Sequence, residues 1–124
     1  MSEPSKTKGQ VEAEISKAMI QFEKEYMGRG PEETRTYIIE DLVLVRHRGV
    51  LTPAEQQLAK SSDPAGGRLL IKRIRTELRE QARPLLAAVV ESITGGKVVS
   101  LHTDVSTVTG ERIIVFTLAA PLEF

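Results

Sequence analysis

The sequence predicts an α+β fold, a two-layer sandwich in which helices cover one face of a four-stranded antiparallel sheet. Residues 34–48 and 98–118 each contain two runs of β-branched and aliphatic residues around a short polar turn, which is the pattern of a β-hairpin. Residues 10–27 and 68–92 instead repeat apolar residues at three- and four-residue steps, which is the spacing of an amphipathic helix. A short helix lies between the halves, so the predicted order is α-ββ-α-α-ββ.

Length and composition indicate one domain, expected over residues 10–118, with tails at 1–9 and 119–124. The 17 basic and 17 acidic residues balance, so net charge does not favour nucleic acid or an anionic membrane surface as a partner. No Cys is present, which excludes disulfides, thiolate metal sites and cysteine nucleophiles. No apolar run approaches the ~20 residues of a transmembrane helix, and we expect a cytoplasmic protein without a signal peptide.

The first predicted helix, residues 10–27, carries an apolar stripe that runs from Val11 to Tyr26. Its charged residues, Glu23 among them, are expected to lie away from this stripe. Gly28 is expected to end the helix, because glycine readily adopts the left-handed conformation of a helix C-terminus.

The first hairpin is expected to have strands at residues 34–39 and 42–48, joined by an acidic turn. A short helix should follow it at once. Thr52 is typical of a helix N-cap, Pro53 suits the first helical position, and Glu55 completes a capping box with Thr52.

The long helix, residues 68–92, contains Pro84, which lacks a backbone N–H and predicts a kink or a break near Ala82. The glycines after Thr94 are expected to cap its end. Its apolar side is expected to comprise Leu70, Ile71, Ile74, Leu78, Leu85, Ala88, Val89 and Ile93.

The second hairpin defines the predicted sheet, since pairing Ser106 with Glu111 places Leu101 opposite Phe116. The core face is then expected to comprise Val99, Leu101, Thr103, Ile114, Phe116 and Leu118. The opposite sheet face should hold Val98, Ile113 and Val115, which favours a dimer or a partner surface there.

His102 and Asp104 alternate onto that second face. Two residues apart on a strand, they suit a His–carboxylate pair or two ligands of a metal site. No third ligand accompanies them in the sequence, and an ordinary exposed polar face is the alternative interpretation.

The second strand ends with Arg46, His47 and Arg48, and Arg35 lies on its neighbour. Together these four residues suit a small anion pocket, because guanidinium groups bind oxyanions in a bidentate manner. Basic residues at strand ends also protect sheet edges, which is the alternative interpretation.

A basic stripe follows the long helix at three- and four-residue steps. Such a stripe suits an acidic partner, nucleic acid or a membrane surface, or else it is a solvated helix face. Its members are Arg68, Lys72, Arg75, Arg79 and Arg83.

Nothing in the sequence indicates catalysis. No nucleophile elbow, phosphate-binding loop or dinucleotide fingerprint is present, and the two His residues lie on separate hairpins. We therefore predict a non-enzymatic protein with no catalytic residues, metal or cofactor.

Five blocks of sequence resemble the MpsC family across about residues 8–118: residues 9–15, 25–31, 49–55, 99–104 and 109–112. The resemblance implies a small accessory or regulatory protein of a sodium-translocating, membrane-potential-generating system whose membrane components are linked to bicarbonate uptake. Such a protein would act by protein contact, as a homodimer in the cytoplasm or at the membrane periphery. The alternatives are a small-ligand or anion-sensing domain and a nucleic-acid-binding module.

Overall fold

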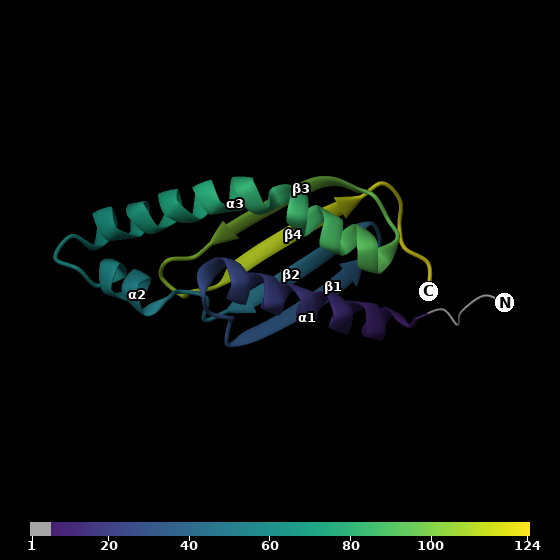
Figure 1. The fold of residues 1–124 in the computed structure, drawn as a ribbon, viewed down its shortest axis with the longest axis horizontal. Coiled ribbons are helices and arrows are strands. Elements are labelled where there is room, and N and C mark those ends of the chain that lie inside the picture. Colours follow the sequence, from purple (N-terminus) through teal and green to yellow (C-terminus); the bar gives the residue numbers. More distant parts are fainter. Residues whose placement is uncertain (1–5) are drawn as a thin grey trace.

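The computed structural model describes residues 6–124 and confirms the predicted α+β fold and its order of elements (Figure 1). The strands form one antiparallel sheet in the order β1-β2-β4-β3, so the two hairpins meet through β2 and β4. The elements are α1 (Lys8–Met27), β1 (Glu33–Ile39), β2 (Leu42–Arg48), α2 (Pro53–Ala59), α3 (Pro64–Thr94), β3 (Val98–Val105) and β4 (Arg112–Leu118).

Helix α1 begins at Lys8, two residues before the predicted start. The hydroxyl of Thr7 accepts from the Gln10 amide at 3.2 Å, and the Gln10 side chain accepts from the Thr7 amide at 2.8 Å. This capping box extends the helix into the predicted N-terminal tail, of which residues 1–5 lie outside the described residues. The helix ends at Gly28, which has a φ of 75°, as expected.

Helix α3 begins at Pro64, four residues earlier than predicted, because Asp63 caps the Gly66 amide. Gly67 lies where α2 and α3 touch, and a Cβ at this position would be 1.9 Å from the Leu58 carbonyl oxygen. The helix is not split at Pro84, since it continues to Thr94 and ends at Gly95. Buried residues on both sides of Pro84, Ala82 and Leu86, keep the two halves packed on the sheet.

The core lies between the helices and one face of the sheet, and both long helices contribute to it. Leu86 and Val90 of α3 are buried, whereas Leu70, Ile74 and Leu85 are exposed, so the predicted apolar side of this helix is rotated from the observed one. The buried members of the main cluster are Val11, Ile15, Met19, Ile38, Val43, Val45, Ala82, Leu86, Val90, Leu101, Ile114, Phe116 and Leu118.

The second hairpin has the predicted register, with Leu101 opposite Phe116. The prediction for Val98 and Val99 is wrong, because an irregularity between Val98 and Ser100 reverses the alternation there. Val98 packs against the core, and Val99 is 57% exposed.

Within residues 6–124, no helix has both the length and the apolarity needed to cross a membrane.

Candidate functional site

The two long helices cover one face of the sheet, and we call the opposite face the open face. Side chains on it form three cross-strand rows, and four of the predicted binding residues lie in them: Arg35, Arg46, His102 and Asp104. The rows are Ile39-Leu42-Thr117-Ser100, Tyr37-Leu44-Val115-His102 and Arg35-Arg46-Ile113-Asp104.

Arg35 and Arg46 lie opposite each other and line a hollow with Arg48 and Tyr37. Carboxylates already contact two of these arginines: Arg35 Nε donates to Glu33 at 2.9 Å, and Arg46 Nη2 lies 2.6 Å from a Glu111 oxygen. The hydrogen bond from Arg35 is the largest cause that lowers the pKa of Glu33. Among the ion pairs of residues 6–124, Arg48 takes part in none, so its guanidinium is the one available to an incoming anion.

His102 and Asp104 share the open face, but in the described chain no hydrogen bond joins them. The Asp104 side chain is 75% exposed and lies 3.3 Å from Lys72 Nζ at the edge of the sheet. Burial by itself raises the pKa of Asp104, and hydrogen bonds from the Val105 amide and Lys72 outweigh it, so the pKa is lowered. Residues 6–124 contain no group of three His, Cys, Asp or Glu side chains placed to hold a metal ion.

His47 does not join Arg35 and Arg46, since neighbouring residues on a strand point to opposite faces. It lies on the inner face, 1% exposed, with Nδ1 2.7 Å from the Thr34 hydroxyl. Burial lowers the pKa of His47 to about 4, and the nearby charges of Arg112 and Arg75 act in the same direction. The imidazole is therefore neutral at physiological pH.

Most of the predicted basic stripe on α3 is engaged within the chain. Arg79 donates to the Thr103 carbonyl at 2.6 Å, and Arg83 donates to the Leu101 carbonyl at 2.7 Å. Both carbonyls belong to β3, an edge strand. Lys72 contacts Asp104, and Arg75 is buried. A solvated stripe requires basic side chains that are exposed and unpaired, and of the five predicted members only the partly exposed Arg68 has no such contact within residues 6–124.

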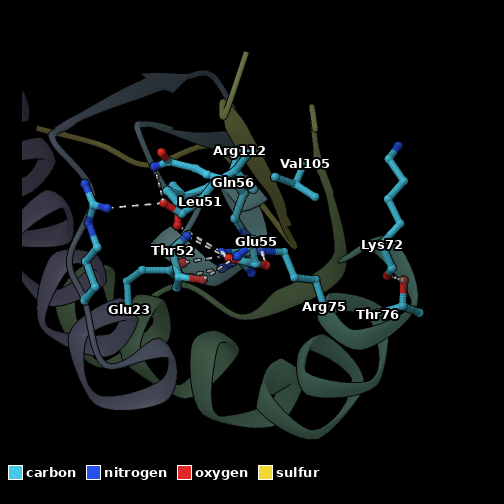
Figure 2. A network of polar contacts seen from close by, with 12 residues as sticks. Glu23, Leu51, Thr52, Glu55, Gln56, Lys72, Arg75, Thr76, Val105 and Arg112 are labelled. Atoms are coloured by element: carbon cyan, nitrogen blue, oxygen red, sulfur yellow. Dashed lines mark hydrogen bonds and ion pairs between the residues drawn. The ribbon is translucent and has the colours of Figure 1, made fainter. Parts of the chain in front are cut away.

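Arg75 belongs to a buried ion network that the sequence did not reveal (Figure 2). Its Nε and Nη2 each donate to Glu55 at 2.7 Å, and Nη2 also donates to the Val50 carbonyl at 2.9 Å. Glu23 bridges two arginines, because it accepts from Arg75 at 3.3 Å and from Arg112 at 2.8 Å. The network thus connects α1, α2, α3 and β4 at one end of the sheet.

The charges of this network are matched inside the protein. Glu23 is 2% exposed and Arg75 is 8% exposed. Burial acts to raise the pKa of Glu55, but hydrogen bonds from Arg75 and Thr52 lower it overall. Burial lowers the pKa of Arg112, against the charge of Glu23. Two carboxylates facing two guanidinium groups give an internally paired centre, whose role is structural.

A groove lies between α1 and α3, and Glu23, Arg75 and Arg112 of the network are among the residues that line it. Phe22 and Tyr26 stack at a centroid distance of 4.5 Å on its α1 side, and Leu78 lines its α3 side. Leu70, Ile74 and Leu85 lie on the same flank of α3 by helical spacing, and all three are exposed. The helical layer therefore presents apolar side chains to solvent.

The model of one protein family, described as the Na⁺-translocating membrane potential-generating system (MpsC), matches residues 7–120. The chain belongs to the MpsC family. It is also 46% identical over 118 residues to "Uncharacterized protein YbcI" of Bacillus subtilis (strain 168), a match that covers 95% of this chain and 93% of that protein. No solved structure matches the chain. The MpsC match includes every helix and strand described above, so the open face and the ion network both lie within it.

Two members of the ion network in this MpsC-family chain do have a signal in the sequence. Glu23 continues the four-residue ladder of Val11, Ile15 and Met19 on α1. Arg75 likewise follows Ile71 by four residues on the buried side of α3. A charged residue that continues a buried ladder predicts a buried ion pair, because it cannot avoid the core and needs a partner there.

Proposed function

We propose that this MpsC-family chain is an accessory or regulatory protein of a Na⁺-translocating, membrane-potential-generating system and that it acts by protein contact. The family match carries the proposal, because its description names that system. In this proposal the chain works in the cytoplasm, at the membrane periphery, as a homodimer. The sodium transport of the system, and the bicarbonate uptake linked to it, depend on its presence.

The groove between α1 and α3 supports contact with a partner protein. Its apolar lining residues, Phe22, Tyr26 and Leu78 among them, suit the apolar side of an amphipathic helix. The exposed Ile74 lies one helical turn before Leu78 on α3 and extends this apolar surface. A subunit of the membrane system with a helix outside the bilayer is the partner that this surface fits.

The first experiment is co-purification of the tagged chain with the membrane subunits from detergent-solubilised membranes, alongside the Na⁺-dependent membrane potential of cells lacking the chain. We expect the subunits to co-purify, and we expect the potential to fall and to recover when the chain is restored. Ile74→Lys should weaken the association, and Thr76→Lys, an exposed change on the same helix, should not. Absence of the subunits together with an unchanged potential would overturn the proposal.

Anion sensing is the second candidate function, and the hollow formed by Arg35, Arg46 and Arg48 favours it. A ligand that binds only the folded chain at a hundredfold excess over its Kd stabilises it by about 2.7 kcal/mol. Thermal denaturation with phosphate, bicarbonate and nucleotides tests this, with Arg48→Gln as the variant that should lose the shift. No shift with any of these anions would count against the candidate. Nucleic-acid binding has no comparable support, since Arg75, Arg79 and Arg83 are engaged within the chain.

A further inference from the structure

Both edges of the sheet are occupied by side chains of the same molecule. At the β1 edge, Glu12 of α1 accepts from the Ile38 amide at 2.8 Å. At the β3 edge, Arg79 and Arg83 bond the carbonyls of Thr103 and Leu101. Strand addition by a second chain would have to displace these side chains. With the helices on one face, the open face is the sheet surface that remains for an interface.

The charges on the open face are divided between its two halves. The β1–β2 half carries Arg35, Arg46 and Arg48 beside Glu33, an excess of positive charge. The β4–β3 half carries Asp104, and Glu111 directly precedes β4. Apolar side chains occupy the space between the charged groups: Tyr37, Ile39, Leu42, Leu44, Ile113 and Val115.

Consider two copies whose open faces meet across a two-fold axis that runs parallel to the strands. This axis places β1 of one copy over β3 of the other and β2 over β4, and it leaves each residue at the same height along the strand direction. Leu44 then faces Val115, because the two are cross-strand partners within each chain. By the same operation Tyr37 faces His102 and Arg35 faces Asp104, since they occupy opposite ends of their rows. The face is therefore complementary to itself, as an isologous dimer requires.

We infer that the open face is the interface of a homodimer with this two-fold geometry, in which Arg35 of each copy pairs with Asp104 of the other. The inference rests on the homodimer of the proposed function and adds which surface and which residues form it. Asp104 contacts Lys72 of its own chain through a side chain that is 75% exposed, so its carboxylate has room for a second cation. Both helical layers point outward in such a dimer, and the groove between α1 and α3 stays accessible to a membrane subunit.

Charge exchange between Arg35 and Asp104 tests the geometry. The dimer dissociation constant is measured by sedimentation equilibrium for the full chain, whose monomer mass is 13.7 kDa. Arg35→Glu and Asp104→Arg each place like charges together twice per dimer, so each should raise this constant about tenfold or more. The double variant reverses both charges and so restores an ion pair. Its dimer dissociation constant should lie within about threefold of the wild-type value. Lys17→Glu, an exposed reversal on α1, is the control and should have no effect.

The outcomes separate this inference from the proposal on which it rests. Weaker dimers for both single variants and recovery in the double variant support the geometry. A wild-type dimer that neither Arg35→Glu nor Asp104→Arg weakens overturns the open-face interface, while the homodimer itself stands. A monomer at every concentration overturns both. Thermal unfolding of each variant shows whether it is folded, and a dimer that the double variant fails to restore although it is folded counts against the Arg35–Asp104 pair.

Discussion

Replacing Glu23 by Gln removes one charge from the buried ion network. Arg75 would then keep the carboxylate of Glu55, whereas Arg112 would lose the one carboxylate it contacts within residues 6–124. Breaking a buried ion pair by removing one partner costs about 3–5 kcal/mol. We expect about 3 kcal/mol for Glu23→Gln, at the lower end of that range, because the Gln carbonyl still accepts one hydrogen bond.

The expected loss can be converted to a melting temperature. An unfolding entropy of about 2.1 cal/mol/K per residue over 124 residues gives about 0.26 kcal/mol/K. A loss of about 3 kcal/mol therefore lowers the Tm by roughly 12 °C. Glu25→Gln is the matched control, because Glu25 is exposed on the same helix and within residues 6–124 its carboxylate hydrogen-bonds the Gln21 side chain alone.

Urea denaturation and calorimetry measure both variants. Glu25→Gln should stay within about 0.5 kcal/mol of the wild type. A double-mutant cycle with Arg112→Met should give a coupling energy of about 1–3 kcal/mol between Glu23 and Arg112, because they bond directly at 2.8 Å. If Glu23→Gln costs no more than Glu25→Gln, or if the cycle shows no coupling, the network does not hold the helices on the sheet and the reasoning is refuted.

Three further predictions concern other sites. The pKa of His47 is about 4 in the folded chain, below its ordinary value of 6.5. The unfolded chain therefore binds more protons between these pH values, and stability falls as pH falls from 6.5 to 4. Urea titrations at pH 7.5 and pH 5 should show about 2 kcal/mol less stability at pH 5 from this group, and His47→Gln should remove that part of the difference. Val98→Ser should lower the free energy of unfolding by about 1 kcal/mol or more, because Val98 packs against the core, and Val99→Ser should lower it by less than about 0.5 kcal/mol, because Val99 is exposed. Equal losses in urea denaturation would contradict the observed strand irregularity. Gly67→Ala should lower the Tm, because its Cβ would lie 1.9 Å from the Leu58 oxygen, whereas Gly9→Ala, with nothing within 4 Å, should raise it by removing freedom from the unfolded chain.

Local chemistry made several elements of the fold predictable. The Thr52–Glu55 capping box forms as expected, because its bonds join residues three apart and need no other part of the chain. Gly28 and Gly95 end their helices for a similar reason. The pairing of Leu101 with Phe116 followed from the length of the turn between their strands.

The surroundings of the predicted binding residues could not be predicted from neighbouring residues in the sequence. The basic spacing on α3 was visible, yet only packing showed that Arg75 faces Glu23 and Glu55 and that Arg79 and Arg83 reach an edge strand. His47 and Arg46 are neighbours in sequence, and the sheet separates them onto opposite faces.

The sequence by itself determined the order of the helices and strands, the helix ends at Gly28 and Gly95, the α+β class and the MpsC family, because caps, periodicity and motif blocks are properties of neighbouring residues. The tertiary structure alone decided the rotation of α3, the buried partners of Glu23 and the rows of the open face. These depend on the order β1-β2-β4-β3, which brings the two hairpins together across a long separation in the chain. Packing decides whether a charged side chain lies beside a buried partner or in solvent, and this decides whether its role is structural or whether it is available to bind another molecule.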